Sequence, residues 1–319
     1  TTAKYIQNVM ETYGVDDINM KISGSSWTSW MENQLEEGVA YFQYRGFYGV
    51  SGFDNGDIDD VNNGHKLPFA TVLTCGTGSF AQETTCLSEK FLRAGSSSSP
   101  KGAVAAVSTA TGNTHTMFNN IIAMGIYDGL FPKSVETAGA ALAYGKLTLF
   151  NAYPTNPYNW VNAFTQWNSL MGDPATHLWT DTPKNLNVIH PLSLSIGTNF
   201  IDFEVVDDHG EPVKDAMVTL LMGNDIIFLT NYTDENGLIT FDLDYIGNGT
   251  ISATITKRDH KPYEGTITFN STGKIVNLDN ESEIEVNDGN DGIANPGEAI
   301  GLLITLKNFG TQTVYGIEG

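Results

Sequence analysis

The sequence predicts an α/β domain built on a parallel β-sheet with flanking helices, followed by an all-β sandwich and the start of a further β module. In residues 1–182, short apolar stretches alternate with segments of helical periodicity, which is typical of a parallel sheet covered on both faces. From Pro183 the helical periodicity stops, and short alternating strands separated by turn residues follow. We therefore expect three domains, at 1–182, 183–278 and 279–319.

Each element of the first domain is expected where its periodicity and its flanking residues agree. The helix that begins near Ser26, for example, has a serine at the N-cap position. The expected strands are 17–22, 39–44, 69–74 and 103–108. The expected helices are 4–13, 26–35, 83–94, 116–129, 135–152 and 160–170.

The second domain shows about seven strands in roughly ninety residues, a density typical of an immunoglobulin-like sandwich. It lacks the Cys…Trp…Cys core and is closer to modules of bacterial surface proteins. The third stretch carries one strand-like run, 301–307, and ends too soon to close a sandwich alone. We expect either that the protein continues or that this segment pairs with another chain by strand addition. The strands expected in the second domain are 192–196, 199–206, 216–222, 226–230, 239–243, 249–256 and 263–269.

The composition excludes several classes of partner. The 319 residues include 37 acidic and 16 basic ones, for a formal net charge of −21, which disfavours binding to nucleic acid or anionic membranes. No apolar run is long enough for a membrane span. The chain begins Thr1-Thr2-Ala3, without methionine or signal peptide, so we expect a processed product or a fragment. Its two cysteines do not make a disulfide framework, and both are expected to be free thiols.

Cys75 is the first candidate for chemistry. It ends the apolar run 69–74 and is followed by Gly76-Thr77-Gly78-Ser79. Ligands of open α/β sheets collect at the carboxyl ends of strands. Glycines there let the backbone approach a substrate and direct N–H groups at a developing oxyanion. From position alone, a nucleophile and a small buried residue at a strand end are equally supported.

The residues around Cys75 resemble those of a known family. Leu67-Pro68-Phe69, then Cys75 to Phe80, then Cys86 to Ala94 are similar to the nucleophile segment of the gingipain family of secreted cysteine peptidases. The likeness continues at 102–111 and at 167–174, which resembles the Gly-Asp-Pro ending of the catalytic domain. It covers about 38–183. It implies a caspase-like fold whose N-terminal portion is missing from this chain.

The resemblance implies roles for individual residues. Cys75 would form a thioester with the peptide carbonyl, and Gly46 and Gly76 would supply N–H groups to the oxyanion. The family's histidine lies in a Gly-His-Gly turn, and the matching turn here has Phe47 or Tyr48 at that place. Phenylalanine cannot move a proton, and a tyrosine is a poor base at neutral pH.

Another residue is therefore needed as the base. His115 follows the strand expected at 103–108 and is the substitute that we consider, against the alternative of a solvated loop histidine. Arg45 and Tyr48 are interpreted as strand-end packing or surface residues.

Two acidic stretches predict structural Ca²⁺, because carboxylate and amide oxygens are its preferred ligands. In the second, Gly292 and Glu298 take the positions of the turn glycine and the bidentate glutamate of an EF-hand loop, counted from Asn287. The alternatives are a solvated acidic loop and an unliganded turn. The expected ligands are Asp54, Asp57, Asp59 and Asp60 in the first stretch, and Asn287, Asp291, Asn295 and Glu298 in the second.

Two functions from different classes follow. The first is a secreted or cell-surface cysteine endopeptidase of bacterial or archaeal origin, acting on protein or peptide substrates. The second is a catalytically inactive caspase-like scaffold in a cell-surface, adhesin or filament-forming protein, favoured by Phe47 and the tandem β modules. Expected partners are the protein's own N-terminal fragment or neighbouring copies that pair through the β modules.

Overall fold

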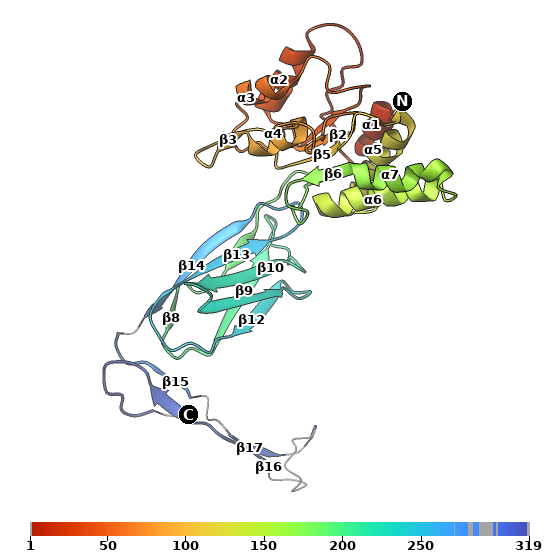
Figure 1. Cartoon of the computed structure of the whole chain (residues 1–319). Coiled ribbons are helices and arrows are strands. Elements are labelled where there is room, and N and C mark those ends of the chain that lie inside the picture. Colours follow the sequence, from red (N-terminus) through yellow and green to blue (C-terminus); the bar gives the residue numbers. More distant parts are fainter. Residues whose placement is uncertain (1, 271, 280–282, 287–295, 298, 318–319) are drawn as a thin grey trace. The chain divides into compact units, whose positions relative to one another are not determined.

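The computed structural model describes residues 2–270, 272–279, 283–286, 296–297 and 299–317. The contacts within the chain divide it into two units, Thr1–Thr182 and Pro183–Gly319 (Figure 1). The further division expected at 278/279 stays a prediction. Within the described residues, no helix is both long enough and apolar enough to cross a bilayer.

The first unit is organised around one sheet. Its strands are ordered β1 (Tyr41–Tyr44), β2 (Phe69–Val72), β5 (Ala105–Thr109) and β6 (Asn168–Met171). The first three are parallel, and β6 runs antiparallel to β5. Every residue of β2 and β5 is buried, as expected for inner strands that are covered on both faces.

Helices cover both faces of this sheet (Figure 1). Because successive strand residues point to opposite faces, Ala105 and Val107 join one core while Ala106 joins the other. The first core is completed by α1 (Thr2–Thr12), α5 (Thr116–Leu130), α6 (Ala138–Ala152) and α7 (Trp160–Trp167). The second is completed by α2 (Trp27–Glu37), α3 (Asn55–Asp60) and α4 (Leu87–Arg93). Smaller elements are the hairpin of β3 (Gly95–Ser96) and β4 (Ser99–Pro100), and the 3-10 turn η1 (Pro157–Asn159).

Three parts of the first unit differ from the sequence predictions. Residues 17–22, expected as a strand, are irregular, because within the described residues they pair with no strand. Helix α3 was not expected, since its sequence is poor in helix formers. Its capping box compensates: Asp54 Oδ1 accepts the Gly56 N–H at 2.7 Å, and Asp57 Oδ2 accepts the Asp54 N–H at 2.6 Å. The helix expected at 160–170 ends at Trp167, and the chain continues as β6.

The second unit contains two sheets packed around one core, with Val205, Val218 and Ile255 fully buried between them. All seven expected strands are present, and β7 (Asn187–Ile189) is additional. The larger sheet is ordered β11 (Ile227–Tyr232), β10 (Met217–Met222), β13 (Thr250–Thr256), β14 (Tyr263–Asn270) and β8 (Ser193–Ser195). The smaller sheet is ordered β12 (Leu238–Asp242), β9 (Phe200–Val206) and β7.

The last described residues form two short ladders. Strand β15 (Val276–Leu278) pairs with β18 (Leu306–Asn308), and β16 (Glu283–Val286) pairs with β17 (Ile300–Leu303). The single strand expected at 301–307 is therefore divided between β17 and β18. An α/β domain followed by β-sheets is confirmed, while the immunoglobulin-like class of the second unit stays a prediction.

Candidate active site

Cys75 lies just beyond the carboxyl end of β2, where parallel α/β sheets place their chemistry. Cys75 is buried, with 6% of its surface exposed. The backbone is held from the neighbouring chain segment, because Tyr48 forms a parallel bridge with Cys75 and the Gly49 N–H donates to the Cys75 carbonyl at 2.9 Å. The position of Cys75 is therefore fixed by the fold and not by a free loop.

The turn after Cys75 is held by hydrogen bonds to the last residue of β5 and to the segment that follows it. Gly76 has φ +81°, and its N–H donates to the Thr111 carbonyl at 2.9 Å. The Gly78 N–H donates to the Thr109 carbonyl at 3.0 Å, and a Cβ at Gly78 would lie 2.3 Å from Ser108 Oγ. The turn requires both glycines, one for its backbone conformation and one for its close packing.

The sulfur of Cys75 has a hydroxyl as its nearest polar partner. Thr114 Oγ1 lies 2.8 Å from Cys75 Sγ, and the Thr114 carbonyl lies 4.0 Å from it. Asn119 Nδ2 donates to Thr114 Oγ1 at 3.3 Å, so the Thr114 hydroxyl can in turn donate to the sulfur. Among the described residues, no imidazole or carboxylate is hydrogen-bonded to this sulfur.

Arg45, directly after β1, supplies a positive charge to this part of the unit. Its Nε–H donates to Asn120 Oδ1 at 2.8 Å, Nη1 donates to the Leu73 carbonyl, and Nη2 donates to the Thr116 carbonyl at 3.3 Å. Burial lowers the pKa of Arg45 to about 10, against an opposing effect of Cys75. The guanidinium therefore remains charged at neutral pH and is close enough to Cys75 to attract a thiolate.

His115 is the N-cap of α5, and its ring is exposed. Nδ1 accepts the Met117 N–H at 3.2 Å, which leaves the proton of the neutral ring on Nε2. The ring packs edge-on against Phe118, with the centroids 5.9 Å apart. No hydrogen bond joins His115 to Cys75 within the described part of the chain. A role as base would require the ring to leave its cap.

The turn at the family's histidine position brings Tyr48, and not Phe47, to the Cys75 loop. The Phe47 side chain is 80% exposed. The Tyr48 ring covers Gly76 and Gly112, since a Cβ at either glycine would lie 3.3 Å from it. Neither residue provides an imidazole.

The two glycines expected at the oxyanion differ in what their N–H groups do. The Gly46 N–H makes no hydrogen bond to any described residue, so it is available to a ligand. The Gly76 N–H donates to Thr111, and it would have to break that bond to serve an oxyanion.

Two cavities border this site. One of about 500 Å³ is lined by Tyr48, Gly76 and Thr77 together with the carboxylates of Asp54 and Glu83. The other, of about 780 Å³, reaches Arg45 and Gly46 from the β1 side of the sheet. Cys75 itself lines neither cavity, and the cavities reach its chain neighbour Gly76 and its electrostatic partner Arg45.

Three of the four carboxylates in the first predicted calcium stretch have separate roles in the structure. Asp54 and Asp57 cap α3, and Asp59 forms an ion pair with Lys90 at 2.5 Å. Among the described residues, no cluster of three or more His, Cys, Asp or Glu side chains is arranged to hold a metal ion. The ligands expected at Asn287, Asp291, Asn295 and Glu298 lie outside the described residues. Calcium binding stays a prediction for both stretches.

Sequence reasoning did not assign Arg45 and Thr114 to the site. Arg45 had one available signal, a cation between an apolar strand and a glycine, but that pattern also fits a surface residue. Thr114 had none, because its contact with Cys75 depends on how the loop before α5 folds back over β2. Cys86 is fully buried at the N-cap of α4, and both cysteines are free thiols, as expected.

Known proteins are similar to this chain in sequence and in fold. The sequence model of peptidase family C25 matches residues 2–179. Gingipain R1 of Porphyromonas gingivalis is 20% identical over 296 residues, which cover 86% of this chain and 29% of that protein. Gingipain R2 of the same species is 21% identical over 247 residues, which cover 73% of this chain and 32% of that protein. The chain thus spans about a third of the length of these relatives.

The solved structures agree with the sequence comparison. The Arg-specific cysteine proteinase gingipain R superposes with a TM-score of 0.71 at 18% identity, covering 84% of this chain and 62% of that one. A complex of Porphyromonas gingivalis RgpB pro- and mature domains gives 0.70 at 18% identity, covering 84% and 63%. This likeness confirms the caspase-like fold. Because the family model covers more than half of the chain, the protein belongs to peptidase family C25, the gingipain type of cysteine peptidase.

Proposed function

We propose that this chain carries the nucleophile of a cysteine endopeptidase that cleaves peptide bonds through a thioester on Cys75. The observation that supports the proposal best is the place of Cys75 in a C25 fold: at the carboxyl end of β2, near the half-buried guanidinium of Arg45 and beside the Thr114 hydroxyl. These two groups stabilise negative charge on sulfur, which is the form that attacks a carbonyl.

The reaction can be written with the groups present. The thiol loses its proton to water, the thiolate sulfur bonds to the peptide carbonyl carbon, and the carbonyl electrons move to oxygen. The Gly46 N–H is the available donor for that oxyanion. As the oxyanion collapses, the C–N bond breaks and the amine takes a proton from water. A second water then hydrolyses the thioester and restores the thiol.

This mechanism lacks an imidazole to carry the proton, and that lack sets the expected rate. General acid–base catalysis contributes about 10² to 10⁴ in rate, and a nucleophile without its base loses most of the catalysis of the pair. We therefore expect cleavage that is slow for a cysteine peptidase but faster than that of a Cys75→Ala variant.

The substrate class is protein or peptide. The solved relative is an Arg-specific proteinase, and the cavity beside Gly76 carries the carboxylates of Asp54 and Glu83, which would attract a basic side chain. A peptide with arginine before the cleaved bond is therefore the first probe to use. A secreted or cell-surface location completes the proposal, supported by the acidic composition and by the similarity to gingipains.

The competing proposal is an inactive caspase-like scaffold. It is favoured by one observation, that the Cys75 sulfur has no hydrogen-bonded base in the described residues while the His115 Nδ1 is occupied by the α5 cap. A scaffold keeps the fold without turnover. Its thiols would behave as two ordinary buried cysteines.

A peptidyl-arginine acyloxymethyl ketone separates the two proposals. The peptidase proposal expects the native protein to be alkylated at Cys75 much faster than at the fully buried Cys86, as measured by mass spectrometry of the digested protein. Cys75→Ala abolishes this labelling, and Cys86→Ala leaves it unchanged. If both thiols react only after unfolding, the scaffold is the correct function.

A further inference from the structure

A chain of hydrogen-bonded side chains leads from β6 to the sulfur of Cys75. Asn119 lies on α5 and Asn168 is the first residue of β6, and both are buried. Asn168 Nδ2 donates to Asn119 Oδ1 at 3.4 Å, and Asn119 Nδ2 donates to Thr114 Oγ1 at 3.3 Å. Thr114 Oγ1 lies 2.8 Å from Cys75 Sγ. We call Asn168, Asn119 and Thr114 the donor chain.

The direction of the donor chain is fixed at its far end. The Phe164 carbonyl accepts from Asn168 Nδ2 at 2.8 Å, and a carbonyl oxygen has no proton to donate. On the other side of the same amide, Asn168 Oδ1 accepts the Thr109 hydroxyl at 3.1 Å. Because the nitrogen of Asn168 faces Asn119, the Asn119 amide presents its oxygen to Asn168 and its nitrogen to Thr114.

The consequence for Cys75 concerns the single proton of the Thr114 hydroxyl. The oxygen of that hydroxyl accepts from Asn119, and its other hydrogen-bond partner within the described residues is Cys75 Sγ. The hydroxyl proton is therefore directed at the sulfur. A hydrogen bond to the charged form of a group favours that form, so this proton stabilises a thiolate.

The alternative is a purely structural role for the two amides at the end of α7. Asn168 is the C-cap residue of that helix, and its backbone N–H also donates to the Phe164 carbonyl. Such a role requires that the buried amides be satisfied, but it requires no particular direction at Cys75. Removing a purely structural amide would lower the stability of the first unit and leave the reactivity of the sulfur unchanged.

We propose that Asn119 and Asn168 are positioning residues, which act on Cys75 by holding the Thr114 hydroxyl as a donor to the thiolate. Their effect on catalysis rests on the proposed peptidase function. Their effect on the sulfur does not, because the reactivity of a thiol can be measured without turnover.

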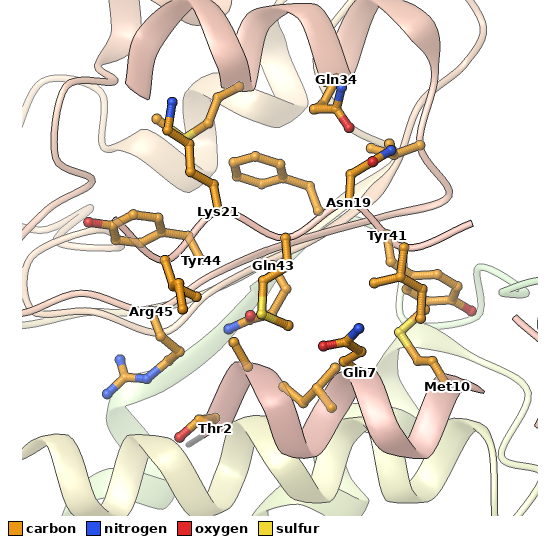
Figure 2. Close-up of a pocket in the computed structure, with 18 of the residues that line it drawn as sticks. Thr2, Gln7, Met10, Asn19, Lys21, Gln34, Tyr41, Gln43, Tyr44 and Arg45 are labelled. Atoms are coloured by element: carbon orange, nitrogen blue, oxygen red, sulfur yellow. The ribbon is translucent and has the colours of Figure 1, made fainter. Parts of the chain in front are cut away.

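The charged and titratable side chains around Cys75 lie outside the donor chain. Figure 2 shows two of them, Tyr44 and Arg45, at the cavity beside β1. The set comprises Tyr44, Arg45, Tyr48, Asp54, Glu83 and His115. Within the described part of the chain, no side-chain hydrogen bond joins any of them to Asn119 or Asn168. Replacing either amide therefore leaves these groups in place.

The test measures how the rate of Cys75 alkylation by iodoacetamide depends on pH, from about pH 5 to about pH 10, by mass spectrometry of the digested full chain. Asn119→Leu removes the donor to Thr114 and is expected to raise the pH midpoint of alkylation by about one unit. Asn168→Leu frees the Asn119 amide to turn over and should raise the midpoint by a smaller amount. The matched control is Asn63→Leu, at a buried asparagine whose amide donates to backbone carbonyls. It should lower the Tm without moving the midpoint.

Variants of Thr114 show whether Asn119 acts through it. Thr114→Val removes the hydroxyl and should raise the midpoint at least as far as Asn119→Leu does. Thr114→Ser keeps a hydroxyl and should retain most of the native value. The double variant Asn119→Leu/Thr114→Val should show no rise beyond that of Thr114→Val, because a residue that acts through another does not add to its effect.

An unchanged midpoint in folded Asn119→Leu, Asn168→Leu or Thr114→Val would overturn the proposal, and so would additive shifts in the double variant. If Asn119→Leu does not fold, Asn119→Ala, which also lacks the donor, takes its place. Cleavage assays on the same proteins keep the two proposals apart. A raised midpoint in a chain that cleaves no peptide supports the donor chain and contradicts the peptidase, whereas cleavage with an unchanged midpoint does the reverse.

Discussion

Arg45 provides the fixed charge of the candidate site. Its side chain is held by hydrogen bonds to Asn120 and to the carbonyls of Leu73 and Thr116. Leu73 is two positions from Cys75 in the sequence, and Thr116 is two positions from Thr114. A guanidinium held in this way attracts anions at the sulfur but cannot accept a proton at neutral pH. The Arg45 guanidinium can thus supply the positive charge that an imidazolium would place near the sulfur, but it cannot transfer the proton.

Removing that charge should change how Cys75 discriminates between alkylating reagents. Arg45→Gln is expected to reduce alkylation by anionic iodoacetate several-fold relative to neutral iodoacetamide, because the attraction at the sulfur is lost. Arg45→Lys should keep most of the ratio. Arg93→Gln, which removes an exposed arginine paired with Glu89, is the matched control. The ratio of the two rates at pH 7 is the measurement, and an unchanged ratio in Arg45→Gln would contradict the role of Arg45.

Tyr127 links the sheet to α5 and makes stability depend on pH. Its hydroxyl lies 3.0 Å from Thr71 Oγ1, and burial raises its pKa above the usual value of 10.0. A phenol whose pKa is raised by folding stabilises the protein fully below the unfolded value and progressively less as pH rises above it. We expect the free energy of unfolding to fall above about pH 10, by up to about 1.4 kcal/mol per pH unit for this group.

The two variants for this prediction remove the same hydroxyl group, one from a buried tyrosine and one from an exposed tyrosine. Tyr127→Phe should make the decline with pH shallower, whereas Tyr158→Phe, at a side chain that is 93% exposed, should leave it as it is. Urea denaturation followed by circular dichroism across pH 9 to about 11.5 gives the slopes. Equal slopes in the wild type and Tyr127→Phe would show that another group controls the alkaline loss.

Helix α3 shows how a local cap can make an element that composition does not favour. Asp54→Ala removes the side-chain acceptor of the Gly56 N–H and should cost about 1 kcal/mol of unfolding free energy. Asp60→Ala, at an exposed residue outside the capping box, is the control and should cost much less. Chemical denaturation is the measurement. If Asp54 acts only as a cap, its cost is the same in EDTA and in calcium. A larger cost in calcium would instead favour the predicted metal site.

The elements that the sequence predicts correctly are those with a local cause. The strands of the second unit follow from alternation and turn residues, and β2 follows from a continuous apolar run. The prediction of a strand at 17–22 was wrong, because alternation of apolar and polar residues specifies which face is buried but does not supply a strand to pair with. Helix α3 was missed because its signal is a cap and not a periodicity.

The candidate site divides in the same way. The place of Cys75 at a strand end could be predicted, since the order of strands and turns is local. The contact of Cys75 with Thr114 and the hydrogen bonds of Arg45 could not be predicted. Each joins residues that are 28 to 75 positions apart in the sequence. The aromatic pair Phe47-Tyr48 indicated that an imidazole is missing from the family's position. That no other base among the described residues is hydrogen-bonded to the Cys75 sulfur could be learned only from the fold.

The charge of the whole chain makes its stability sensitive to cations. A formal net charge of −21 implies that carboxylates repel one another in the folded state. Any salt screens that repulsion, and at 0.1 M the screening length is about 10 Å. A gain in Tm with salt is therefore expected without any specific site. The calcium hypothesis needs a comparison in which screening is held constant.

Melting in CaCl₂, MgCl₂ and NaCl at equal ionic strength makes that comparison. Screening depends on the charge of the cation and not on its identity. Screening alone therefore predicts nearly equal Tm values in the two divalent salts. Calcium sites predict a higher Tm in CaCl₂ than in MgCl₂, because the many oxygen ligands expected in 287–298 suit Ca²⁺ better than the small, strictly octahedral Mg²⁺. Glu298→Gln should remove the difference if that loop binds the ion, and Glu264→Gln, outside both acidic stretches, should not. Identical melting in the two divalent salts would leave a protein whose acidic surface is balanced by diffuse counterions alone.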